Sequence, residues 1–268
     1  STVASRGPLS LARRRPSGSS SYVPKTAQTP FVGSSLNGTY GWAIGGMGAT
    51  GAGRSNVYRL DFGNDTVAQS ARGPLVGTAY LNSAQGNANY GWSYAGGDAS
   101  FSVITSIYRI NYSNDNTTSE YRSNLTMARH SSAAASNSYV GWIVGGTVMG
   151  YGIASNIDKM DFSNDGVDAA PRTTLSAARY RIGGISTDAY GWFAGGSSIG
   201  SAVVDRLDFA ADLSTTLSRG PLLVAKGLMG SGTTDYNYGW YAGGYSGGLT
   251  NSTVQRIDLS NDSGTATT

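Results

Sequence analysis

Residues 190–196 read Tyr-Gly-Trp-Phe-Ala-Gly-Gly, and variants of this stretch occur five times along the 268-residue chain. Every tryptophan of the chain belongs to one of these copies, and a glycine precedes each of them. The five are Trp42, Trp92, Trp142, Trp192 and Trp240, at spacings of 50, 50, 50 and 48 residues. A fixed period of about fifty residues is typical of repeat proteins and predicts five copies of one structural unit.

Each copy continues into a segment of alternating apolar and polar residues, such as residues 204–209, Val-Asp-Arg-Leu-Asp-Phe. Alternation with a period of two predicts a β-strand. An Asn-Asp turn follows in four copies and Ala211-Asp212 in the remaining one, and both Asn and Asp favour tight turns. An Arg-x-x-Leu element and a run of small residues then lead to the next Gly-Trp. The pattern predicts an all-β, five-bladed β-propeller with four antiparallel strands in each blade.

The ends of the chain suggest how the ring closes. Residues 6–9, Arg-Gly-Pro-Leu, repeat residues 72–75, which lead into the second blade. We therefore expect residues 1–10 to form a closing strand that completes the last blade and covers its open edge. Residues 22–37 exceed the repeat and are expected to be an inserted loop in the first hairpin of the first blade. The second copy has one extra residue before Gly96-Gly97, which suggests a β-bulge. The whole chain, 1–268, is then a single domain, and a piece of a longer array is the alternative.

Composition excludes several classes of site. The chain has no cysteine, one histidine (His130) and one glutamate (Glu120), so disulfides, cysteine-ligated metals, histidine clusters and glutamate pairs are ruled out. We expect no cofactor and no metal. A net charge of +3 is too weak a field to indicate nucleic-acid binding. Apolar runs are far shorter than the roughly 20 residues of a membrane helix, so membrane insertion is not expected.

Most basic residues recur at the same places in the repeat. Because every blade needs the same structural contacts, we expect these basic residues to form ion pairs and hydrogen bonds within and between blades. We expect the tryptophans to pack between neighbouring blades. For one of the three sets given next, the candidate channel ring, the alternative is an anion-binding site in the central channel. The set on the alternating strand is Arg59, Arg109, Lys159, Arg206 and Arg256; the second is Arg6, Arg72, Arg122, Arg172 and Arg219; the candidate channel ring is Arg13, Arg129, Arg179 and Lys226.

The loops after the glycine pairs differ in every copy. In a propeller such loops gather on one face, where a rigid scaffold presents a binding surface. Their apolar, aromatic and basic side chains suit a protein or glycan partner, although tolerated loop variation explains them as well. The candidate residues are Met47, Arg54, Phe101, Met149, Tyr151 and Tyr245. The insertion at 22–37 is expected on the opposite face, as an arm for a neighbouring subunit.

Three motifs together resemble a known family. They are residues 190–196, the Asp-Phe-Ser-Asn-Asp of residues 161–165 and the Arg-Gly-Pro-Leu-Ser of residues 6–10. These sequence motifs resemble the kelch repeat and, more closely, the kelch-like arrays of virion structural proteins of marine cyanophages. The resemblance implies a location on the virion surface, in a capsid or tail appendage, with other virion proteins as partners and an extracellular site after release.

Three functions compete. The first is a non-enzymatic structural or interaction protein of a phage particle, with a role in host adsorption included. The second is a lectin-like propeller that binds carbohydrate on the host surface. An enzyme is the third, because some five-bladed propellers are glycosidases with paired carboxylates; here the aspartates outside the repeated positions are scattered. Kelch-type copper oxidases have a similar fold but need a cysteine and histidines that this chain lacks.

Overall fold

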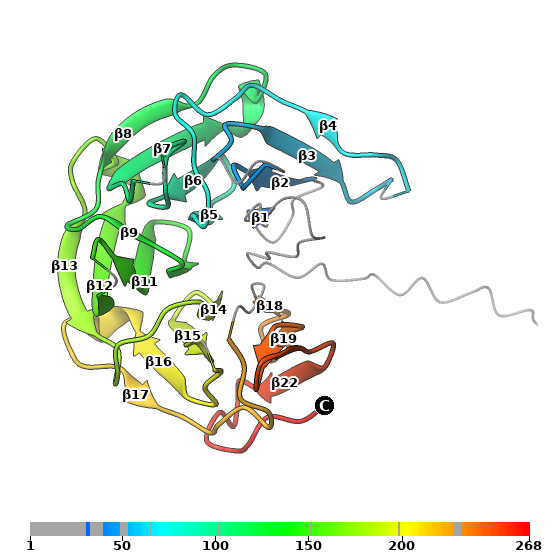
Figure 1. Cartoon of the computed structure of the whole chain (residues 1–268), viewed down its shortest axis with the longest axis vertical. Helices are drawn as coiled ribbons and strands as arrows, with labels where there is room; N and C mark the ends of the chain where they lie inside the picture. The colour runs from blue at the N-terminus through cyan, green and yellow to red at the C-terminus, as the bar shows by residue number, and fades with distance from the viewer. Residues whose placement is uncertain are drawn as a thin grey trace, which may run out of the picture.

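The chain forms a ring of five small antiparallel sheets, a five-bladed β-propeller (Figure 1). A computed structural model describes residues 31–32, 40–48, 53–64, 66–100, 102–150, 152–197, 199–227 and 232–268. The predicted fold class is therefore confirmed, including the mostly four-stranded blades. Among these residues no helix is both long and apolar enough to cross a membrane.

Each blade follows the chain in order, from its innermost strand to its outermost. Blade one holds β1 (Phe31–Val32), β2 (Tyr40–Ile44), β3 (Val57–Asp61) and β4 (Ser70–Ala71). Blade two holds β5 (Ser83–Gly86), β6 (Tyr90–Tyr94), β7 (Ser106–Asn111) and β8 (Glu120–Asn124). Blade four holds β14 (Gly183–Ser186), β15 (Tyr190–Ala194), β16 (Val204–Asp208) and β17 (Leu217–Ser218).

Blades three and five vary this plan. Blade three holds β10 (Ala133–Ser136), β11 (Val140–Val148), β12 (Ile153–Asp161) and β13 (Ala170–Thr174), and the short β9 (Arg129–His130) pairs with the far end of β11. Blade five holds β18 (Gly232–Thr234), β19 (Tyr238–Ala242) and β22 (Val254–Asp258), with a hairpin of β20 (Tyr245–Ser246) and β21 (Leu249–Thr250) in its loop. Three single-turn 3-10 helices follow the third strands of blades two to four: η1 (Tyr112–Asn114), η2 (Phe162–Asn164) and η3 (Phe209–Ala211).

The hydrophobic core lies between the blades. Four clusters of buried side chains fill the boundaries between blades one and two, two and three, three and four, and four and five. A tryptophan stands in each, and it stacks on an aromatic ring of the next blade in three of them; Trp92 and Phe162, for example, lie 4.0 Å apart between ring centroids. Trp42, Trp92, Trp142 and Trp192 therefore pack between neighbouring blades.

The glycine pairs link neighbouring blades through the backbone. Gly146 has a φ of +110°, and a Cβ there would lie 2.7 Å from the His130 carbonyl oxygen, so only glycine fits. Its N–H donates to the Arg179 carbonyl of the next blade at 2.9 Å. In blade two the equivalent donor is Gly96, paired with Arg129, and Ala95 takes the left-handed place of the first glycine at φ 56°. The expected bulge at Gly96-Gly97 is therefore wrong, since β6 and β7 pair without a register shift.

Two expectations about the ends meet different outcomes. The closing strand 1–10 lies outside the described residues. Near the C-terminus, Thr267 pairs with Arg256 of β22, as Ser70 pairs with Arg59, so the outermost position of blade five begins with the chain's own end. Residues 31–32 form β1, the innermost strand of blade one, and so are not part of an insertion in the first hairpin; the rest of 22–37 lies outside the described residues.

Candidate functional site

In blades two to five, a buried aspartate in the turn after the third strand ties the blade to the preceding one. Between blades two and three, Trp92 Nε1 donates a hydrogen bond to Asp165 Oδ2 at 2.8 Å. Arg109 Nη1 lies 3.1 Å from the same oxygen, and Arg122 Nη2 lies 2.7 Å from Oδ1. We call this set of one tryptophan, two basic residues and one aspartate an inter-blade clamp.

The clamp occurs at all four boundaries between successive blades. The Nε1–Oδ2 distance is 2.8, 2.8, 3.0 and 2.8 Å in chain order, so the geometry repeats closely. Hydrogen bonds to a charged group stabilise a fold by about 1.5–3 kcal/mol each, because the buried carboxylate otherwise lacks partners. The clamps are Trp42, Arg59, Arg72 and Asp115; Trp92, Arg109, Arg122 and Asp165; Trp142, Lys159, Arg172 and Asp212; and Trp192, Arg206, Arg219 and Asp262.

Sequence reasoning found the bases of the clamp and missed its acid. It named no acidic partner for these bases. The Asp or Asn two residues after each strand base caps the following turn instead; Asp161 Oδ1, for example, accepts the Ser163 N–H at 2.8 Å. The true acceptor is the aspartate assigned only to turn formation. A signal was present, since the fourth copy replaces Asn by Ala211 and keeps Asp212.

The candidate channel ring is not an open basic ring in the described residues. Arg129 is 0% exposed, and its Nη2 lies 2.7 Å from Asp158 of the same blade. Arg179 is paired in the same way with Asp205 at 2.6 Å. Lys226 Nζ donates to a backbone carbonyl at 2.5 Å. Burial lowers the pKa of all three groups. Each of these side chains makes its polar contacts inside one blade. Arg13 lies outside the described residues.

Blade two replaces the buried ion pair with a neutral arrangement. The positions of Arg129 and Asp158 are taken there by Ala79 and Tyr108, both buried. A Cβ at Gly77 would lie 2.5 Å from the Tyr108 hydroxyl, so glycine makes room for the ring. Blade three has Met127 at that place. The same slot in the fold thus accepts either an ion pair or a tyrosine.

The loops after the glycine pairs present exposed apolar side chains on one face. Met149 is 71% exposed, and Ile199 and Leu249 are 76% and 74% exposed on the corresponding loops of blades four and five. These two loops touch, because the Gly247 N–H donates to the Ile199 carbonyl at 3.4 Å. Sequence reasoning did not name Ile199 or Leu249, although both are apolar residues within loops that it had singled out.

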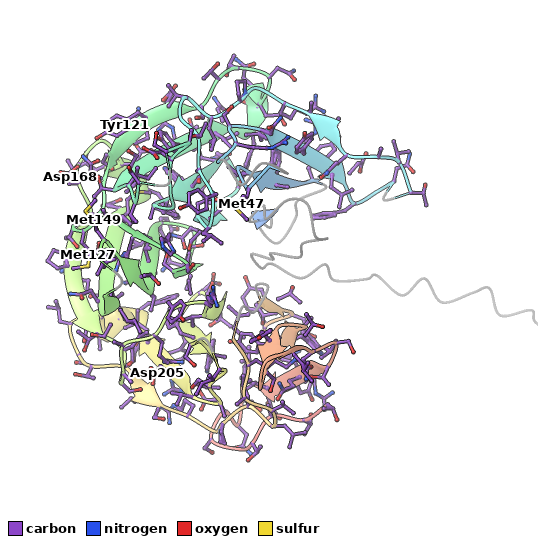
Figure 2. All side chains as sticks on the ribbon, viewed as in Figure 1. Met47, Tyr121, Met127, Met149, Asp168 and Asp205 are labelled. Carbon is purple, nitrogen blue, oxygen red and sulfur yellow. The ribbon has the colours of Figure 1, made fainter. Side chains whose placement is uncertain are left out.

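The other candidate loop residues are less uniform. Arg54 is exposed, Met47 and Tyr245 are half-buried, and Phe101 and Tyr151 lie outside the described residues. Figure 2 places Met47 near the middle of the ring and Met149 over blade three. The structure therefore brings these residues to one face without gathering them into one cluster.

Around the axis, on this same face, the backbone links three blades. The Ser131 N–H donates to the Leu81 carbonyl at 2.8 Å, and the Arg181 N–H donates to the Ser131 carbonyl at 2.7 Å. All three residues have left-handed φ values of 52°, 55° and 59°, which costs energy for residues other than glycine. These bonds explain how the strained conformations are held.

A small aromatic and basic group surrounds these links. The rings of Tyr80 and His130 lie 6.4 Å apart, and the Arg181 guanidinium lies 5.2 Å from the centre of the Tyr180 ring. Burial, and next the charge of Arg181, lower the pKa of His130. No carboxylate of the described residues lies within ion-pair distance of Arg181, so its charge is not compensated locally.

Four of the aspartates outside the repeat positions have structural partners. Asp158 and Asp205 belong to the buried ion pairs, and Asp168 accepts the Asn124 N–H of the preceding blade at 2.8 Å. Asp98 caps its own loop through the Ser100 N–H. Within the described ranges, no three acidic or histidine side chains converge as metal ligands would.

No protein family matches the chain, and no curated protein is similar to it in sequence.

Proposed function

We propose that the protein is a non-enzymatic interaction scaffold that presents its loop face to a partner. The observation that carries the proposal is the exposure of Met149, Ile199 and Leu249 on loops at one end of the strands. Exposed apolar groups on adjacent loops are typical of protein contact surfaces. The clamps support the proposal, because they hold the loops on a rigid frame.

The pairing of the repeated charges supports a structural assignment over catalysis or nucleic-acid binding. Ten lysine and arginine side chains form ion pairs with aspartate or glutamate in the described residues. Charges that are neutralised within the fold are not available to bind phosphates. The aspartates of the clamps are likewise committed as hydrogen-bond acceptors.

We further propose that the scaffold belongs to a phage particle, as a capsid or tail appendage on the virion surface. This location is supported by the resemblance of residues 190–196 and 161–165 to the kelch-like repeats of cyanophage virion proteins. Mass spectrometry of purified virions is expected to detect the chain, and the amount of chain per virion should not fall after stringent washing. Its absence from washed virions would refute the location, and a change in host adsorption on its removal would identify an adsorption role.

A carbohydrate-binding propeller is the second candidate. It is favoured by the Arg181–Tyr180 contact and the half-buried Tyr245 on the loop face, since aromatic and basic side chains suit sugars with acidic groups. A glycan array with the purified chain tests it, with Tyr245→Ala and Arg181→Ala expected to lose binding. Tyr121→Ala is a matched control, because Tyr121 is 50% exposed on the outermost strand β8. Equal loss in the control would count against a specific site.

A further inference from the structure

Two positions at the loop-face end of a blade form a backbone pair close to the axis. One position comes directly after the glycine pair or its equivalent, and the other shortly precedes the innermost strand. Tyr80 and Gly97 pair in this way in blade two, and His130 and Thr147 in blade three. Met47 holds the first of these positions in blade one, and Figure 2 shows it near the middle of the ring. The paired positions therefore lie around the axis on the loop face.

Four successive blades carry one aromatic ring at this pair of positions. Tyr80, His130 and Tyr180 follow one another at intervals of 50 residues. Blade five has Gly227 at that place, and the aromatic residue is its partner: the Gly227 N–H donates to the Tyr245 carbonyl at 2.7 Å, and the Tyr245 N–H donates back at 2.6 Å. Either residue of the pair can thus supply the ring.

The glycines of these pairs are required by close contacts. In blade two a Cβ at Gly97 would overlap Tyr80 Cε1, so the tyrosine ring lies over the glycine. In blade five a Cβ at Gly227 would overlap the Ser197 carbonyl oxygen of blade four. Glycine therefore stands on one side of the pair in blade two and on the other side in blade five, and both blades keep an aromatic ring at the axis.

Arg181 adds an uncompensated positive charge to this group of rings. Arg54, Arg181 and Arg256 are the arginines of the described residues that have no carboxylate partner, and of these three only Arg181 is half-buried. Its guanidinium lies 5.2 Å from the centre of the Tyr180 ring. A guanidinium that has lost part of its hydration favours an anion beside it, because charge-assisted hydrogen bonds replace the lost water contacts.

His130 is close enough to Arg181 to respond to that anion. Its Nδ1 lies 2.9 Å from Ser131 Oγ, and its ring lies 6.4 Å from the Tyr80 ring. Burial and then the charge of Arg181 lower the pKa of His130. Burial and then the charge of Asp98 raise the pKa of Tyr80, so Asp98 is a carboxylate near this group. An anion paired with Arg181 cancels its charge and therefore raises the pKa of His130.

We propose that Arg181 binds the carboxylate of a uronic-acid unit in a glycan, and that the aromatic rings around the axis contact the sugar. The guanidinium offers paired N–H donors that match a carboxylate, and aromatic rings pack on the apolar faces of sugars. This proposal rests on the carbohydrate-binding function, which it narrows to acidic glycans and to one site. Arg129, Arg179 and Lys226 take no part, because their polar contacts lie inside single blades.

Titration of the purified full chain with digalacturonate, followed by the NMR signals of His130, tests the site. Neutral galactobiose is the matched sugar, because it lacks only the carboxylates. We expect digalacturonate to raise the titration midpoint of His130 by about half a pH unit or more, and galactobiose to leave it unchanged.

Arg181→Met should weaken digalacturonate binding about tenfold or more, because it removes the charge-assisted contact. Arg256→Met is the matched control and should bind as the wild type does. Arg256 is likewise an arginine without a carboxylate partner, 4.5 Å from the centre of a tyrosine ring, but it lies in the middle of β22.

Three results would overturn the acidic-sugar site. An unchanged His130 midpoint with digalacturonate, or equal affinity for galactobiose, would remove Arg181 as the binding group. Inorganic phosphate binding as tightly as digalacturonate would make this a site for small anions and not for a sugar. In these cases a glycan array that still shows binding leaves the carbohydrate-binding function standing. An array with no bound glycan refutes that function and the site together.

Discussion

Trp142 Nε1 donates to Asp212 Oδ2 at 3.0 Å, although 70 residues separate the two along the chain. The bond crosses from blade three to blade four, and Lys159 Nζ lies 2.8 Å from the same oxygen. Neighbouring blades are therefore joined by a polar contact within an apolar boundary. Such contacts specify how blades dock, because apolar packing alone is less directional.

The first prediction concerns the strength of one clamp. Asp165→Ala should lower the free energy of unfolding by about 1–3 kcal/mol, since Trp92, Arg109 and Arg122 lose a shared acceptor. Urea denaturation, compared at equal m-value, measures the loss. Asp188→Ala is the control, because Asp188 is exposed. An equal effect of the two substitutions would show that the clamp does not stabilise the ring.

The second prediction exchanges the interior of one blade for that of another. Arg129→Ala should destabilise the fold by about 3–5 kcal/mol, because it leaves the buried Asp158 without its partner. Adding Asp158→Tyr and Met127→Gly reproduces the Ala79, Tyr108 and Gly77 set of blade two and should recover most of the loss.

Thermal and urea unfolding of the single and triple variants measure this recovery. A triple variant no more stable than Arg129→Ala would mean that the slots of the two blades are not equivalent.

The third prediction concerns the single histidine. Burial, and then Arg181, lower the pKa of His130, so its NMR titration midpoint should lie below the ordinary value of about 6.5. Because the folded-state pKa is below the unfolded one, the unfolded chain binds the proton first. The stability linked to His130 is therefore complete above about pH 6.5 and declines as the pH falls toward the folded-state pKa.

Arg181→Met should move this midpoint upward without restoring it fully, since burial remains. Arg54→Met is the control, as Arg54 is an exposed arginine on a loop of blade one. An unchanged midpoint in Arg181→Met would show that the two side chains do not interact.

The fourth prediction concerns the loop face. Met149→Ser, Ile199→Ser and Leu249→Ser should weaken binding to the virion by about tenfold or more in combination, through loss of buried apolar area. Their melting temperatures should stay within a degree or two of the wild type, because all three side chains are largely exposed.

Tyr139→Ser is the matched control for the loop face. Tyr139 is 76% exposed and lies at the opposite end of β11 from Met149. Rebinding of the purified variants to virions that lack the protein compares the two faces directly. Weaker binding in the control alone would move the interface to the other face.

The sequence was sufficient for the fold because its signals are local and repeated. The tryptophan period gave the number of blades, and alternation such as that in residues 204–209 gave the strands. The clamp acceptors were missed because their partners lie 70 or 73 residues away on another blade. The same limit applies to Arg129, because the sequence pattern of a recurring basic residue is the same whether its side chain faces a channel or a buried aspartate.

Register errors have a different physical cause. A β-bulge was expected before Gly96-Gly97 because this pair was aligned with the glycine pairs of the other blades. In the structure Ala95 adopts the left-handed conformation of the first glycine, so the true equivalent of the glycine pair begins one residue earlier. Phe31 and Val32 were assigned to an insertion because no tryptophan or glycine pair marks an innermost strand. The candidate loop residues were named from chemistry, while their exposure depended on packing: Met47 is half-buried and Met149 is not.

Cryo-electron microscopy of intact virions tests the central proposal most directly. We expect a five-bladed ring on the particle surface, with the loops that carry Met149, Ile199 and Leu249 against a neighbouring virion protein or a bound host glycan. A particle map with no such ring, or one in which this face contacts nothing while the opposite face is anchored, would contradict the proposal.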